Sequence, residues 1–209
     1  MRVPLTEEVL EEKAARASAA GAAGHRELAR QLLAWAQHPQ ERDEVPVADL
    51  LVCAGEQFAL LEDHASALDA YLAAAEAEVA TSPDARGSVV QALLDLGRRS
   101  EAEQASEELR RSRPVTAVTY HLVGEAWESA GELDKANRWL TRGVLLAESQ
   151  GAQMDWAMLL IGRLRVRRAL GFPPDAYDEA ALQMVEESSA ERARAVATRE
   201  GEHAVIDLF

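Results

Sequence analysis

Small and bulky apolar residues recur in this chain at intervals of 34 or 35 residues. The small series is Ala67, Ala102 and Ala136, and a second series is Ala54, Val89 and Val123. The bulky series is Phe58, Leu93 and Trp127. A period of this length is typical of helix-pair arrays, in which each unit buries its apolar face only by stacking on the next. The spacing therefore predicts an elongated array of similar units.

Each period contains two apolar stretches separated by a glycine turn. In the unit from 120 to 150, one face carries Val123 and Trp127, the letters "AGEL" interrupt it, and a second face begins at Ala136. This spacing predicts two antiparallel helices per unit. Gly124 is expected where the paired helices cross, because a larger side chain would hold the backbones apart.

The composition agrees with a purely helical fold. Hydrophobic residues make up 48% of the chain and aromatic residues only 5%, and 41 residues are alanine. Alanine has the highest helix propensity and allows helices to approach closely, and alternating strand patterns are missing. We predict an all-α chain of about ten helices in five pairs. The last two helices are expected from about 154 to 170 and from about 175 to 199.

The best-matching unit resembles the tetratricopeptide repeat (TPR) family through Tyr120, Gly124, Trp127, Gly131, Ala136 and Leu140. The unit from 48 to 79 is similar, and the unit between the two is degenerate. The resemblance implies a right-handed α-solenoid of antiparallel helix pairs, with the first helix of each pair on the concave side. One domain spans 1–209, with a degenerate unit at 5–38, the clearest repeats at 48–150, and an atypical helix pair and capping tail at 153–209.

No pattern in the sequence indicates catalysis or a cofactor. No two of the five histidines lie three or four residues apart, and they are His25, His38, His64, His121 and His203. The single cysteine, Cys53, lies in an apolar run and is expected to be a small buried residue. Nucleophile-elbow and phosphate-loop motifs are missing. We predict a non-enzymatic protein without a metal site.

The net charge of −14 disfavours polyanionic partners, namely nucleic acids and anionic membranes. No run approaches the length of about 18 apolar residues that a membrane span needs, and the acidic N-terminus does not read as a signal peptide. A cytoplasmic location is expected. Lys13 and Lys135 are the only lysines beside many arginines, which suggests a GC-rich, bacterial genome.

The expected concave face predicts an acidic, partly apolar groove that suits a basic or amphipathic peptide. Its residues would be Val52, Glu56, Leu60, Gln91, Asp95, His121, Glu125 and Glu128. The leading interpretation is a scaffold or adaptor that binds a protein segment there. Two alternatives stay open. The groove residues are merely solvated, or the chain is a regulatory sensor domain for a small ligand or signalling peptide.

Two further features leave alternatives open. The cluster "RLRVRR" places Arg163 and Arg167 on one helix face, either paired with acidic residues of neighbouring helices or forming a patch for an anion or acidic partner. The last residues, "EHAVIDLF", either cap the array or dock into a groove of the same chain or of a second copy. A homodimer is one possible result.

Overall fold

The computed structural model describes residues 2–190, and within that range the chain is all-α, with no strand. Its helices are α1 (Glu7–Ala19), α2 (Gly21–Gln37), α3 (Val47–Ala59), α4 (His64–Ala75), α5 (Ala85–Asp95), α6 (Arg99–Ser112), α7 (Ala117–Ser129), α8 (Leu133–Gln150) and α9 (Gln153–Ala169). A tenth helix begins at 176 and reaches 190, the last described residue. The expected all-α class is confirmed. The tail expected to cap or dock lies outside the described residues.

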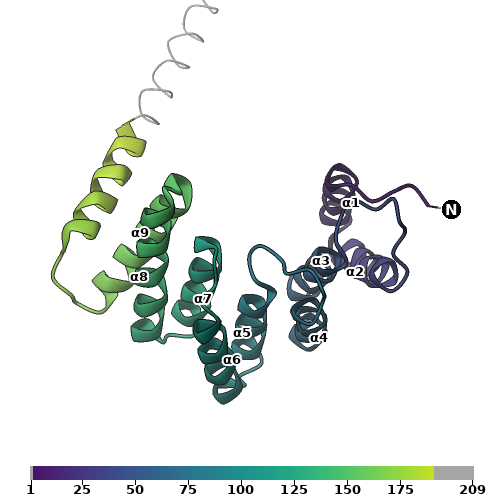
Figure 1. Cartoon of the computed structure of the whole chain (residues 1–209), viewed down its shortest axis with the longest axis horizontal. Coiled ribbons are helices and arrows are strands. Elements are labelled where there is room, and N and C mark those ends of the chain that lie inside the picture. The colour runs from purple at the N-terminus through teal and green to yellow at the C-terminus, as the bar shows by residue number, and fades with distance from the viewer. Residues whose placement is uncertain (1, 191–209) are drawn as a thin grey trace, which may run out of the picture.

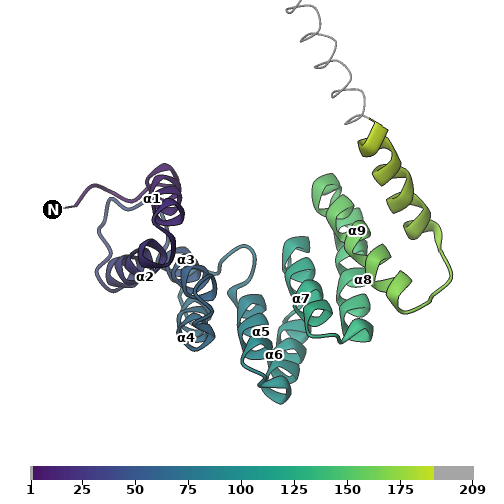
Figure 2. The same ribbon diagram turned by 180° about the vertical axis from the view of Figure 1, so that it is seen from behind.

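The helix pairs are laid out in sequence order along the long axis, so the pair α1 and α2 and the helix from 176 lie at opposite ends (Figure 1). Each helix from α1 to α6 packs against its sequence neighbour, and so does each from α7 to α9. In addition, α5 packs against α7, and α7 against α9. The view from behind shows the same succession (Figure 2). Within the described part of the chain, no helix combines the length and the apolar character needed to cross a membrane.

The turns inside the helix pairs share one geometry. After α3, α5, α7 and α9, a residue takes a left-handed φ between 58° and 76°, and these residues are Glu62, Gly97, Gly131 and Gly171. The next N–H in each turn donates to a carbonyl five residues earlier, as from Asp63 to Phe58 at 3.0 Å and from Glu132 to Trp127 at 2.9 Å. This bond satisfies a carbonyl left free at the helix end and stops the helix there.

The paired helices approach closely at glycine. A Cβ at Gly55 would lie 2.4 Å from the ring of Tyr71, and one at Gly124 would lie 2.6 Å from Leu140 Cγ. In both pairs the large side chain follows the glycine by sixteen residues. Trp127 is 1% exposed, and burying a side chain of this size contributes at least about 1.5–3 kcal/mol. The glycines that recur in the sequence therefore mark the points where the two helices of a pair approach most closely.

The buried core has two parts that meet at α4. The N-terminal part includes Leu32, Leu50 and Ala70, and the larger part runs from Ala67 and Tyr71 to the end of the described helices. Because α3 and α5 make little direct contact, α4 carries most of the packing between the second and third helix pairs. This separation leaves space for a cleft beside α3.

Candidate binding cleft

Two cavities lie next to each other along α3 and share one lining residue, Glu56. The larger, of about 580 Å³, is bounded by α1, the segment 44–46, α3 and the segment 80–83. The smaller, of about 150 Å³, is bounded by α3, α4, α5 and Leu122 of α7. We call the two together the acidic cleft.

Six carboxylates line the acidic cleft, and neither an arginine nor a lysine does; the carboxylates are those of Glu7, Glu11, Glu44, Asp49, Glu56 and Asp95. Asp95 accepts a hydrogen bond from Gln91 at 2.8 Å, and its Oδ2 lies 3.6 Å from His64 Nδ1. The other five form no ion pair with any residue between 2 and 190. Within the described residues, no ion pair compensates their negative charge.

Burial and the neighbouring negative charges raise the pKa values of several groups in the acidic cleft. Desolvation raises the pKa of Glu56, although the side chain remains exposed at the mouth of the cleft. Desolvation, helped by the charge of Glu7, also raises the pKa of Asp49. Burial raises the pKa of Cys53 to about 11, so its thiol stays protonated at neutral pH. A cation entering the cleft would relieve the cost of the crowded negative charges.

The structure brings four of the expected groove residues into the acidic cleft. Val52 and Glu56 lie on α3, and Gln91 and Asp95 lie on α5. Leu60 does not line either cavity and is 63% exposed at the end of α3. These four residues therefore line cavities around α3 and α5, and their role in binding stays a prediction.

The other three expected residues lie on α7, beyond the acidic cleft. Arg165 of α9 donates to both oxygens of Glu128 at 2.6 Å, and its Nη2 lies 3.7 Å from Glu125. His121 is packed beneath them, with Nδ1 3.4 Å from Glu125, and burial lowers its pKa. Arg165 thus compensates the acidic charge that the sequence assigned to this end of the groove.

Two residues of the arginine cluster, Arg163 and Arg167, are paired inside the protein. Arg163, which is 5% exposed, donates to Asp175 at 2.6 Å and to Asp178 at 3.0 Å, and Arg167 donates to Asp178 at 2.8 Å. The expected alternative of a patch for an external anion at Arg163 and Arg167 is wrong. Their guanidinium groups already have carboxylate partners from the start of the last described helix.

Asp175 and Asp178 also close the N-terminus of that helix. Asp175 accepts from the backbone of Tyr177 and Asp178, and Asp178 accepts from the backbone of Asp175 at 3.1 Å. The hydrogen bond from Arg163 lowers the pKa of Asp175 to about 2. This reciprocal cap ties the helix from 176 to α9.

Sequence reasoning missed the carboxylates that α1 and the segment before α3 contribute. Glu7 and Glu11 are one helical turn apart, which is a visible signal for a shared acidic face. The sequence does not show that this face meets Asp49 and Glu56, because the contact depends on how α1 lies beside α3. The acidic cleft is therefore wider and more acidic than the expected groove.

Between residues 2 and 190, no group of three or more histidine, cysteine, aspartate or glutamate side chains is arranged to hold a metal ion. No known protein family, curated protein or solved structure matches this chain. The function is therefore argued from the geometry and charge of the acidic cleft.

Proposed function

We propose that this protein is a non-enzymatic interaction module that binds a basic or amphipathic protein segment in the acidic cleft. The helix pairs would form a right-handed α-solenoid of the TPR type, with α3, α5 and α7 on its inner side. The module would act as a scaffold or adaptor, and binding would depend on shape and charge without a cofactor.

The helix turns support the solenoid part of this proposal. The same left-handed turn follows four successive first helices, and α5, α7 and α9 pack on one another as first helices do in such an array. The close glycine contacts at Gly55 and Gly124 recur at the spacing of the sequence pattern. Similar turns within successive pairs favour a regular stacking of the pairs.

The observation that carries the binding proposal is the uncompensated charge of the acidic cleft. Five carboxylates without an ion-pair partner in the described chain surround a cavity of about 580 Å³. An ammonium or guanidinium group would gain several charge-assisted hydrogen bonds there without displacing an internal partner. This arrangement favours the binding of lysine or arginine side chains.

The apolar part of the cleft favours an amphipathic segment. Leu10, Val45, Pro46 and Val52 lie between the carboxylates of the larger cavity. Apolar side chains of a partner would bury surface there, while its basic side chains reach the rim. A purely basic peptide would leave this apolar surface exposed to water.

A displayed library of short random peptides, selected on the purified protein, tests the proposal. We expect the selected peptides to be enriched in lysine and arginine beside apolar residues, and their affinity to fall with added salt. The triple variant Glu11→Gln, Glu44→Gln, Glu56→Gln should weaken their binding by about tenfold to a hundredfold, measured by fluorescence anisotropy.

A second triple variant controls for the change in net charge. Glu41→Gln, Asp134→Asn and Glu186→Gln remove three exposed carboxylates outside the acidic cleft. This variant should bind the selected peptides with nearly unchanged affinity. Enrichment of acidic peptides, or equal weakening by the two triple variants, would contradict the proposal.

A further inference from the structure

The pair α5 and α6 departs from its neighbours at the point where paired helices cross. The positions of Gly55 and Tyr71 in one pair, and of Gly124 and Leu140 in another, are taken here by Val90 and Ser106. The larger residue is thus on the first helix and the smaller on the second. A serine in place of a leucine or tyrosine leaves unfilled volume on the side of α6.

A cavity of about 240 Å³ lies beside Ser106, between α6 and α8. Its inner wall is formed by Trp127 and Trp139, which are 1% and 4% exposed. Both indole N–H groups donate to Ser106 Oγ, at 3.1 Å and 3.0 Å. These bonds fix the two rings and the serine oxygen in one rigid arrangement.

The hydroxyl proton of Ser106 has no acceptor among the described residues. The oxygen uses its acceptor capacity on the two indoles, and no bond from this hydroxyl to a carbonyl or carboxylate of residues 2–190 is formed. Ser106 is 6% exposed and lines the cavity. A buried donor without an acceptor is costly, so an acceptor atom placed in the cavity would be favourable.

Cationic side chains surround this donor. Arg110, Lys135, Arg138 and Arg142 line the cavity together with two carboxylates, those of Glu103 and Glu107. Glu103 forms an ion pair with Lys135 at 2.5 Å, and Glu107 forms one with Arg110 at 2.6 Å.

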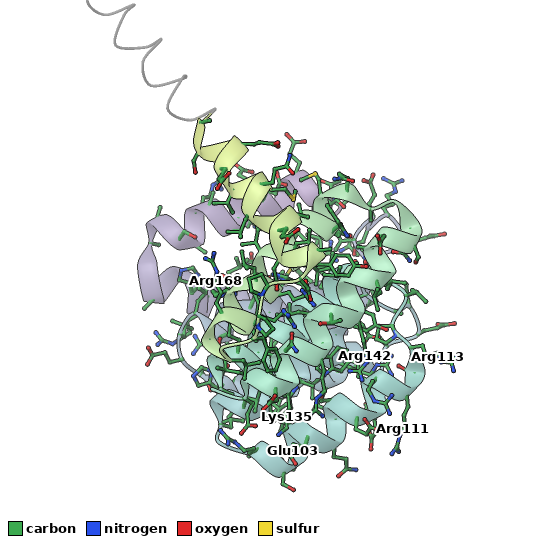
Figure 3. All side chains as sticks on the ribbon, turned by 90° about the vertical axis from the view of Figure 1, so that its left-hand side faces the viewer. Glu103, Arg111, Arg113, Lys135, Arg142 and Arg168 are labelled. Atoms are coloured by element: carbon green, nitrogen blue, oxygen red, sulfur yellow. The ribbon has the colours of Figure 1, made fainter. Side chains whose placement is uncertain are left out.

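The two remaining cations have no carboxylate partner. Arg138 and Arg142 form no ion pair within residues 2–190, in a protein with a large excess of acidic groups. Figure 3 shows the face of α6 and α8 that carries Arg142, Lys135 and Glu103. Among the described residues, Arg142 Nη1 donates only to the backbone carbonyl of Arg138, at 3.4 Å. Two guanidinium groups without a carboxylate partner in the described chain and a buried hydroxyl therefore line one small cavity.

We propose that this cavity is a binding site for a single oxyanion group, a carboxylate or a phosphoryl group. Ser106 donates its hydroxyl proton to one oxygen, and Arg138 and Arg142 donate to the others. The cavity volume suits one such group at the end of a side chain or small molecule, and the negative charge elsewhere on the protein opposes longer polyanions. The site is separate from the acidic cleft, and its ligand has the opposite charge.

The test is a titration of the ¹⁵N-labelled protein with inorganic phosphate and, separately, with a short blocked glutamate peptide, at constant ionic strength. The indole N–H signals of Trp127 and Trp139 report on the site, because both groups bond to Ser106. The signals of the other two tryptophans are assigned with the Trp35→Phe and Trp156→Phe variants. We expect a saturable shift of the Trp127 and Trp139 signals with at least one of the two anions.

Paired variants decide whether this shift comes from the proposed site. Arg138→Gln with Arg142→Gln should weaken binding by roughly tenfold or more. The control is Arg26→Gln with Arg30→Gln, an exposed pair of the same spacing on α2, and it should leave the affinity unchanged. Saturation by phosphate alone would identify a phosphoryl ligand, and saturation by the peptide alone a carboxylate. No saturable shift with either anion, or equal loss in both double variants, would overturn the proposal.

Discussion

The pair α3 and α4 and the pair α7 and α8 are built on the same packing plan. Gly55 meets Tyr71 in the first pair, and Gly124 meets Leu140 in the second, each across sixteen residues. The turn after α3 and the turn after α7 make the same backbone hydrogen bond. The two pairs therefore share the features that set the distance and angle between their helices.

The same two pairs differ in the charge that they present. Glu56 and Glu125 occupy equivalent positions of the pattern, 69 residues apart. Glu56 has no ion-pair partner among the described residues, whereas Arg165 of α9 lies beside Glu125 and binds Glu128. Packing is determined within a pair, but the availability of a surface charge is determined by the next helix in space.

The largest expected effect concerns the shared packing plan. Gly55→Ala and Gly124→Ala should each reduce the free energy of unfolding by about 1–3 kcal/mol, because the added methyl group would overlap Tyr71 or Leu140. Chemical denaturation followed by circular dichroism measures the loss.

A third glycine provides the control for that measurement. A Cβ at Gly162 in α9 would lie 3.4 Å from Leu140, which is an ordinary contact distance. Gly162→Ala should therefore be neutral, or stabilising by up to about 1 kcal/mol through higher helix propensity. If all three variants lose equal stability, the close approach is not what distinguishes Gly55 and Gly124.

Much of this helix packing could be predicted from the sequence, because it depends on spacing within one pair. The positions of Gly124, Trp127 and Leu140 indicate which faces meet, and α9 lies within one residue of its expected bounds. The role of Ser106 could not be predicted. Nothing in the sequence of this degenerate unit indicates that two indole N–H groups from other helices donate to the serine hydroxyl.

The second effect concerns the turns, where the two pairs differ in one residue. Glu62 takes a left-handed φ of 58°, whereas Gly131 takes 76° at the equivalent position. A residue with a Cβ is strained in this region by about 1 kcal/mol. Glu62→Gly should thus stabilise the protein by about 0.5–1 kcal/mol, and Gly131→Ala should destabilise it by about 1 kcal/mol. The thermal midpoints of the two variants should shift in opposite directions, and a shift in the same direction would contradict this explanation.

The charges of the candidate site were less predictable than the helices. The sequence places Glu56 and Glu125 in one acidic groove, since both follow the same pattern. It does not show that Arg165 reaches back to α7, because the turn glycines Gly131 and Gly171 are 40 residues apart, whereas the repeat is 34 or 35 residues long. In the same way, the pairing of Arg163 with Asp175 depends on a turn that brings the next helix back over α9.

A third, smaller effect would make the two pairs more alike. Arg165→Gln should release Glu125 and Glu128 and raise the affinity for a basic peptide selected on this protein by roughly two- to fivefold. Stability should change by less than about 1 kcal/mol, because the side chain of Arg165 is 52% exposed. Arg168→Gln is the control, since it removes an exposed charge from the same helix without breaking an ion pair of the described chain. Equal gains in affinity for the two variants would show that only net charge matters.

The smallest expected effect is the pH dependence that Glu56 gives to peptide binding. Desolvation raises the pKa of Glu56, so this carboxyl takes up a proton at a higher pH than an ordinary glutamate. A bound cation stabilises the ionised form, and binding must therefore release the proton. The affinity for a basic peptide should fall by roughly two- to threefold as the pH falls through the raised pKa.

In the absence of peptide, the stability of the folded protein changes with pH in the opposite direction to the peptide affinity. The folded state holds this proton more tightly than the unfolded state, so Glu56 adds stability as the pH falls through the raised pKa. Peptide titrations between pH 7 and pH 4.5, set beside denaturation curves at the same pH values, separate the two effects. Glu56→Gln should reduce the slope of both profiles. Slopes that Glu56→Gln leaves unchanged would show that this carboxyl does not carry the pH dependence, and would remove this contrast between the two helix pairs.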